Sequence, residues 1–153
     1  MIDATIILVA SAGLALFYLQ VTCEAVLAHE FKHSYFESVV RANQLEFASL
    51  RRLVSENGFP GDRATLFSAL QGDFLVLRYL LKHSGSPKRR YTSIERVLMA
   101  YFHLLLVSLR LRHAFNLQER SAVLKLTSLL QYFANVVGRQ ANESATVPLS
   151  VSR

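Results

Sequence analysis

The hydrophobic and polar positions divide the chain into one long apolar stretch near its beginning and four later segments with a helical period. Residues 4–23 carry no charged side chain, and Gln20 is the most polar of them. A helix of this length spans about 30 Å, the thickness of the hydrocarbon core of a bilayer. The stretch therefore predicts a membrane-spanning helix whose side chains contact lipid.

Insertion of this helix is favourable by a moderate margin. Nine large apolar side chains each contribute roughly 0.3–0.6 kcal/mol, about 4 kcal/mol together, before the polar positions are subtracted. Two other interpretations stay open, namely a buried first helix of a soluble bundle and a signal peptide cleaved after Ala28. Twenty residues without a charge are unusual for the first, and the start of the chain lacks the positive charge typical of the second. The nine side chains are Ile6, Ile7, Leu8, Val9, Leu14, Leu16, Phe17, Leu19 and Val21.

Beyond this stretch, apolar side chains recur every three or four residues, as in amphipathic helices. The first such segment, residues 31–57, has neither proline nor glycine, and no strong helix breaker separates it from the apolar stretch. The second, residues 63–83, follows Asp62, a suitable N-cap. Both segments are predicted to be single helices.

The third and fourth helices begin at recognisable caps. Thr92 and Glu95 have the spacing of a capping box, and Asn116 and Glu119 repeat it. The uncharged residues 97–109 are too few to cross a bilayer, so we expect them to form the central core helix. The last helix is expected to end at Gly138.

These segments predict an all-α protein with three parts. Residues 1–28 form a single transmembrane helix, residues 29–140 a small cytoplasmic bundle of about four helices, and residues 141–153 a flexible tail. The 52% share of hydrophobic residues excludes a disordered chain, and the single cysteine excludes a disulfide scaffold. We expect that lone residue, Cys23, to be a small buried apolar side chain.

The charges are unevenly distributed along the chain. Residues 1–28 carry −2 and the remainder carries +8, which together give the net charge of +6. Since Lys32, Arg41 and Arg51 follow the apolar stretch and no basic residue precedes it, the positive-inside rule predicts an external N-terminus and a cytoplasmic bundle.

One short motif has the form of a metal site. His29, Glu30 and His33 make the pattern H-E-x-x-H, in which two histidines one helical turn apart can hold one zinc ion. In this pentapeptide the chain resembles the zincin metallopeptidases, and the resemblance implies that Glu30 acts as the general base toward metal-bound water. The alternative interpretation is a polar turn beside the membrane that holds no metal.

The densest basic cluster, Lys88, Arg89 and Arg90, stands between the second and third helices. Three interpretations remain open for it: a solvated loop, a contact with an anionic membrane surface, and a nucleic-acid contact, which we favour least. We predict that these three residues contact the membrane surface.

No glycine-rich phosphate loop or nucleophile elbow occurs in the sequence, and no second motif supplies a third zinc ligand. The sequence therefore predicts a non-enzymatic, membrane-anchored interaction module or accessory subunit without a cofactor, bound to lipid and to a protein partner. The alternative is a small membrane-bound zinc hydrolase that uses His29, Glu30 and His33.

Overall fold

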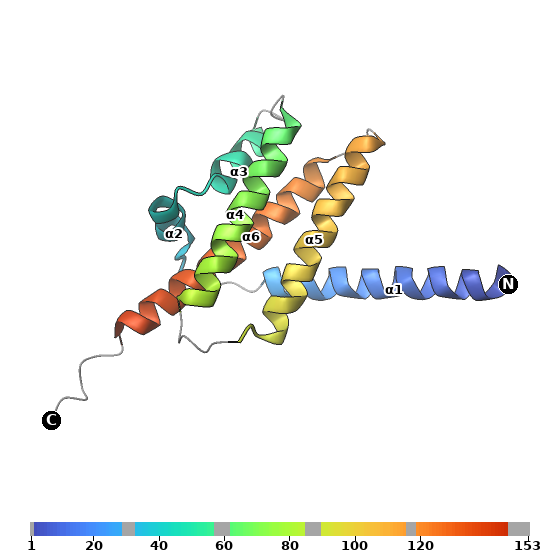
Figure 1. The fold of residues 1–153 in the computed structure, drawn as a ribbon, viewed down its shortest axis with the longest axis horizontal. Helices are drawn as coiled ribbons and strands as arrows, with labels where there is room; N and C mark the ends of the chain where they lie inside the picture. The colour runs from blue at the N-terminus through green and yellow to red at the C-terminus, as the bar shows by residue number, and fades with distance from the viewer. Residues whose placement is uncertain (1, 29–32, 57–61, 85–89, 116–118, 147–153) are drawn as a thin grey trace.

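The computed structural model describes residues 2–28, 33–56, 62–84, 90–115 and 119–146, and these are almost entirely helical. The predicted all-α class is thus confirmed for the described residues. The helices are α1 (Ile2–Leu27), α2 (Phe36–Asn43), α3 (Phe47–Glu56), α4 (Arg63–His83), α5 (Ser93–Ala114) and α6 (Arg120–Thr146). Figure 1 shows α2 to α6 gathered into a bundle and α1 extending away from it.

Helix α6 lies at the centre of the bundle and packs against α2, α3, α4 and α5. Its buried side chains Leu126, Leu130, Phe133 and Val137 recur every three or four residues, which aligns them on one face. The expectation that residues 97–109 form the central helix is wrong. They lie in α5, at the edge of the bundle, where Leu104 and Val107 are exposed.

Aromatic rings join three helices in the core. The Phe74 ring of α4 stacks on the Phe102 ring of α5 with a centroid separation of 4.1 Å, and it meets the Phe133 ring of α6 edge-on at 6.2 Å. Each of these side chains is at least 97% buried. Offset and edge-to-face aromatic pairs add about 0.5–1.5 kcal/mol beyond the area they bury, so this cluster fixes the order of α4, α5 and α6.

The starts of α4 and α5 agree with the sequence. The Asp62 side chain accepts a hydrogen bond from the Ala64 N–H, as expected of an N-cap. The capping box of Thr92 and Glu95 is formed, with the Thr92 N–H donating to the Glu95 carboxylate at 2.9 Å. Both signals are local, which explains why they could be predicted from neighbouring residues alone.

The predicted single helix at residues 31–57 is wrong, because the structure divides it into α2 and α3. Gln44 adopts the left-handed conformation with φ 52° and ends α2. Two buried side chains from other helices then supply the caps that stabilise the break. Asn135 of α6 caps the start of α2, and Asp73 of α4 caps the start of α3. The chain before α2 is also not helical at residues 33–35, so α1 does not run on into it as one unbroken helix.

The prediction that the last helix ends at Gly138 is wrong, because α6 continues to Thr146. A Cβ atom at Gly138 would overlap the Cβ of Tyr35 just before α2, so this glycine permits a close approach. The helix starts at Arg120, directly after Glu119, and Asn116 of the predicted box lies outside the described residues. Residues 141–146 of the expected tail are helical, and residues 147–153 are not described.

Helix α1 is long and apolar enough to cross a membrane, and only 6% of its most apolar window is buried in the protein. Its contact with the bundle is confined to its C-terminal end, where Leu19, Val26 and Leu27 pack on the core and Cys23 is 1% exposed. The expectation that Cys23 is a buried apolar side chain is confirmed. Glu24 adds an ion pair with Lys125 of α6 at 2.6 Å, so α1 is attached to the bundle at one end only.

Candidate functional site

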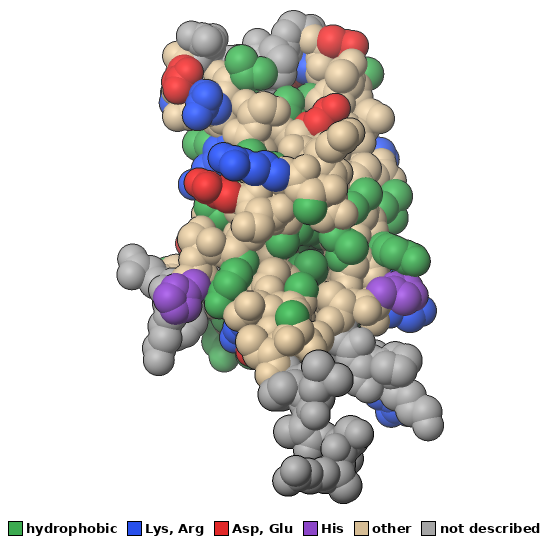
Figure 2. All heavy atoms as spheres, turned by 90° about the vertical axis from the view of Figure 1, so that its left-hand side faces the viewer, with side chains coloured by type: hydrophobic (Ala, Val, Ile, Leu, Met, Phe, Trp, Pro, Cys, Tyr) green, Lys and Arg blue, Asp and Glu red, His purple; other side chains and the backbone are tan. Residues whose placement is uncertain are grey.

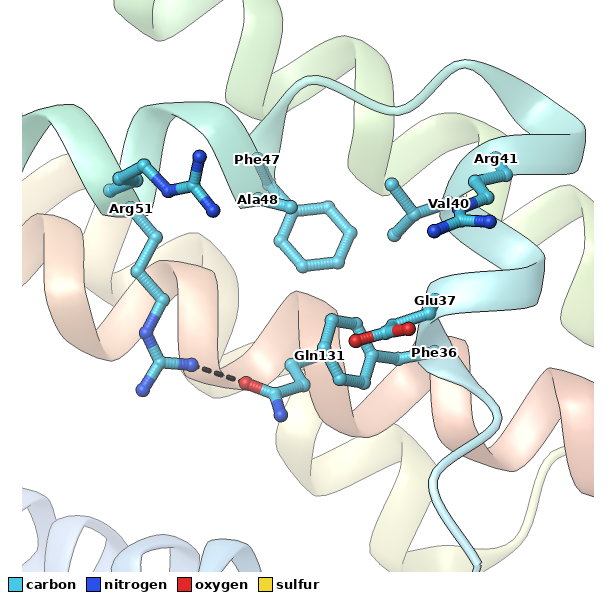
Figure 3. A pocket seen from close by; sticks show the side chains of 9 residues that line it. Phe36, Glu37, Val40, Arg41, Phe47, Ala48, Arg51 and Gln131 are labelled. Carbon is cyan, nitrogen blue, oxygen red and sulfur yellow. Dashed lines mark hydrogen bonds between the residues drawn. The ribbon is translucent and has the colours of Figure 1, made fainter.

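A pocket of about 620 Å³ opens between α2, α3 and α6, on the side of the bundle away from the free end of α1. Its volume lies within the range of about 300–1,000 Å³ that is usual for ligand-binding clefts. Figure 3 shows the lining side chains converging from the two short helices and from Gln131 of α6. The lining residues are Phe36, Glu37, Val40, Arg41, Phe47, Ala48, Arg51, Arg52 and Gln131.

Helix α2 is held beside the pocket by Asn135, which is 6% exposed. Its side-chain oxygen accepts hydrogen bonds from the Tyr35 and Phe36 N–H groups, both at 2.9 Å. These amides stand at the first turn of α2 and have no partner within that helix, so Asn135 replaces a local cap. The position of Phe36 in the pocket therefore depends on a residue 99 positions away in the sequence.

Helix α3 is held in the same way by Asp73. One oxygen of its carboxylate accepts from the Glu46 N–H at 2.9 Å and from the Phe47 N–H at 2.6 Å. Burial raises the pKa of Asp73 above its usual value, although the two backbone donors favour the charged form. The two short helices that form the pocket are thus capped by buried polar side chains of the longer helices.

The floor of the pocket is apolar. Phe47 is 1% exposed and lies in the core, while Phe36, Val40 and Ala48 are half-buried and pack against that core. A shallow apolar floor of this kind excludes water from the apolar part of a bound group, which is the main source of affinity in most protein interfaces.

The rim of the pocket is basic. Arg51 donates a hydrogen bond to the Gln131 side chain, as Figure 3 shows, which fixes its guanidinium at the edge. Within the described residues, the guanidinium groups of Arg41 and Arg52 make no ion pair or hydrogen bond. With Glu37 as the single acid among the lining residues, the rim carries a net charge of +2. Planar guanidinium groups bind carboxylates and phosphates through paired hydrogen bonds.

Figure 2 faces the side of the molecule that lies away from α1. Hydrophobic side chains extend across the middle of this face, and Lys, Arg, Asp and Glu side chains lie mainly above them and at the edges. An apolar centre with a charged rim is the usual anatomy of a protein-binding surface. The pocket is therefore suited to an apolar side chain that is flanked by carboxylates.

The predicted metal residues are only partly described. His33 is exposed, and its ring lies edge-on to the Tyr35 ring at 6.1 Å, whereas His29 and Glu30 lie outside the described residues. In the ranges that the structure describes, no group of three or more His, Cys, Asp or Glu side chains could hold a metal ion. The zinc site remains a prediction from the sequence.

Of the predicted membrane-contact residues, Arg90 is described and exposed, while Lys88 and Arg89 lie outside the described residues. The sequence does not predict the pocket, because its pattern predicts one continuous helix over residues 31–57. One signal did point to it: Asp73 stands on the apolar face of its helix between Leu70, Phe74 and Leu77. An acid at such a position needs a hydrogen-bond partner from another segment.

Comparison of the chain with protein-family models, with curated proteins and with solved structures gives no match.

Proposed function

We propose that this protein is a membrane-anchored helical interaction module, an accessory subunit that holds a partner protein at a membrane. The observation that carries the proposal is the contrast within the chain between α1 and the bundle. Most of the exposed side chains of α1 are apolar, among them Leu8 and Leu14, each 70% exposed. Soluble proteins rarely expose so large a contiguous apolar surface to water. The length of α1 matches the thickness of the hydrocarbon core of a bilayer.

The proposed orientation places the N-terminus outside and the bundle in the cytoplasm. Residues 1–28 contain neither lysine nor arginine, and basic residues are frequent after them. Reporter fusions to the C-terminus test this orientation. Green fluorescent protein placed there should fluoresce, and alkaline phosphatase placed there should be inactive. The opposite pair of results would contradict the orientation.

The proposed partner contact is the pocket between α2, α3 and α6, which would take an apolar side chain flanked by acidic residues. Support comes from the half-buried Phe36 and Val40 in the floor and the guanidinium groups of Arg41 and Arg52 at the rim. Phe36, Val40 and Ala48 are only partly buried although they pack against the core, so they leave apolar surface in the pocket for a partner to cover.

Site-specific photocrosslinking in cells tests the contact. A photoreactive amino acid at Ala48, in the pocket, should give one dominant crosslinked product, and the same amino acid at the exposed Ser68 on α4 should not. The double change of Arg41→Glu and Arg52→Glu should abolish the product by reversing the charge of the rim. Equal products from both positions, or a product that survives the charge reversal, would contradict the proposed contact.

The zinc-hydrolase hypothesis remains the alternative, and it can be tested separately. Purified full-length protein should contain no stoichiometric zinc if the interaction module is correct. Zinc that is present in the protein and lost on His29→Ala or His33→Ala would favour the hydrolase.

A further inference from the structure

Helix α5 presents an apolar face that no part of the described protein covers. This surface, here called the α5 apolar face, consists of Val97, Leu104, Val107 and Leu111, and Ile94 and Phe115 extend it at the two ends. Leu111 is 55% exposed and Phe115 is 72% exposed. The side chains recur at three-, four- and seven-residue intervals, which places them on one side of the helix. The other side of α5 buries Leu98, Phe102 and Leu109 in the core.

The α5 apolar face lies next to the place where α1 leaves the bundle. Helix α1 packs against α5 and α6 through its last turns, where Cys23 is buried and Glu24 pairs with Lys125. These contacts begin at Leu19, near the end of the predicted span at residues 4–23. In Figure 1, α5 is on the side of the bundle toward which the free part of α1 extends. If α1 is inserted in a bilayer, the membrane surface therefore lies next to α5.

The charges on α5 suit an anionic lipid surface. The only acidic residue of this helix is Glu95, which is 5% exposed and is held in the capping box with Thr92. Arg90, shortly before the helix, and Arg96, in its first turns, are both exposed. Arg110 is exposed as well, and its guanidinium lies 5.8 Å from the Phe67 ring of α4. Basic residues beside an apolar face are typical of helices that lie in the headgroup region of a membrane.

We propose that α5 lies along the surface of the leaflet that α1 enters, with the α5 apolar face at the boundary between headgroups and acyl chains. The inference rests on the proposed function, since it requires α1 to be in lipid. Figure 1 shows α5 running across α1 rather than along it, so α5 lies closer to the plane of the membrane than to its normal when α1 spans the bilayer. The bundle is then held at two places, and the pocket between α2, α3 and α6 faces away from the lipid.

Spin labels on the full-length protein test this arrangement in nanodiscs of phosphatidylcholine and phosphatidylglycerol. In a Cys23→Ala background, single cysteines carry the label at Leu104 on the α5 apolar face, at Ser38 on α2 and at Leu8 on α1. Oxygen collects in lipid and a nickel chelate stays in water. The ratio of oxygen to nickel accessibility should thus be several-fold higher at Leu104 than at Ser38. If Leu104→Cys does not fold, Leu111→Cys reports on the same face.

The label at Leu8 reports whether α1 is in lipid, so it distinguishes an error in this inference from an error in the proposed function. If Leu8 is in lipid and Leu104 has the same ratio as Ser38, the α5 apolar face is in water and the inference is overturned while the anchor stands. If Leu8 is also in water, both proposals fall. Low accessibility of Leu104 to both reagents, with dipolar broadening between labels, would mean that a second copy covers the face, which also overturns the inference.

Discussion

Helices α1 and α6 have nearly the same length, 26 and 27 residues, and opposite surroundings. Helix α6 carries charged and polar residues, yet it is the most buried helix of the bundle, with thirteen buried positions. Helix α1 is the more apolar of the two, yet only 6% of its most apolar window is buried. Hydrophobicity by itself therefore does not determine which helix forms the core.

The difference lies in the arrangement of the apolar residues rather than in their number. In α6 most apolar residues recur with the helical period, and the helices α2 to α5 pack around them and bury all of residues 133–138. In α1 they occur on all sides, and a bundle of this size cannot surround the whole helix. A uniformly apolar helix is suited to lipid, and an amphipathic helix is suited to a protein core.

Removal of one aromatic ring from each helix should change the stability of the bundle very differently. Phe133→Ala in α6 should lower the free energy of unfolding of the bundle by about 3–5 kcal/mol, because it leaves a cavity beside the Phe74 ring. Phe17→Ala in α1, where the ring is 64% exposed, should leave that free energy nearly unchanged. Denaturant unfolding in detergent, followed by circular dichroism, measures both. Equal losses in the two variants would mean that α1 is part of the core.

A single arginine should release the protein from the membrane when it is placed in α1 and should have no such effect when it is placed on the surface of the bundle. Leu14→Arg in α1 should lose about 2.5–3.5 kcal/mol of insertion free energy, which is close to the whole margin expected for this helix. The protein should then shift from the membrane fraction to the soluble fraction. Leu53→Arg, at a 43% exposed position of α3, is the matched control and should stay in the membrane fraction. Full membrane retention of Leu14→Arg would contradict the assignment of α1 to lipid.

The two helices also differ in what surrounds their glycines. Gly138→Ala should destabilise the bundle by about 1–3 kcal/mol, because the added methyl group displaces Tyr35 and the start of α2. It should also weaken crosslinking from Ala48, since α2 forms one wall of the pocket. Gly13→Ala in α1 has nothing within 4 Å of the new atom and should affect neither measurement. A neutral Gly138→Ala would show that α2 is not docked as described.

The smallest effect is expected where the two helices meet. The pair between Glu24 and Lys125 is exposed to solvent on both sides, so Lys125→Gln should cost less than about 1 kcal/mol and should lose even that at high salt. Arg139→Gln, which removes a pair with Glu143 inside α6, is the control for a general effect of charge. A large loss that does not depend on salt would mean that this pair, rather than the buried Cys23 region, holds α1 to the bundle.

The parts of the fold that could be predicted from the sequence are those fixed by nearby residues. Asp62 and the pair Thr92 and Glu95 mark the starts of α4 and α5 because their hydrogen bonds close within three residues. The break between α2 and α3 has no such local mark. It depends on Asn135 and Asp73, which reach the amides of α2 and α3 only after the long helices have packed. The role of Gly138 also has no local mark, because this glycine allows Tyr35 to approach α6 and does not end the helix.

The candidate site could be predicted only as a list of residue types. Arg41, Arg51 and Arg52 were recognised as the polar positions of one amphipathic segment, and a single straight helix gave no reason for them to surround a pocket. The bend at Gln44 turns the Phe36 and Phe47 side chains toward the same space, and α6 closes the pocket with Gln131. Concave sites formed by several elements require the tertiary contacts that a linear pattern does not contain.

Alkaline extraction of membranes from cells that produce the full-length protein shows whether α1 lies in lipid. If α1 lies in lipid, the protein stays in the membrane pellet at high pH and is released only by detergent. Intact mass measurement should find residues 1–28 still attached. Release into the aqueous fraction without detergent, with the intact mass retained, would contradict the account, and so would a mature chain that lacks α1.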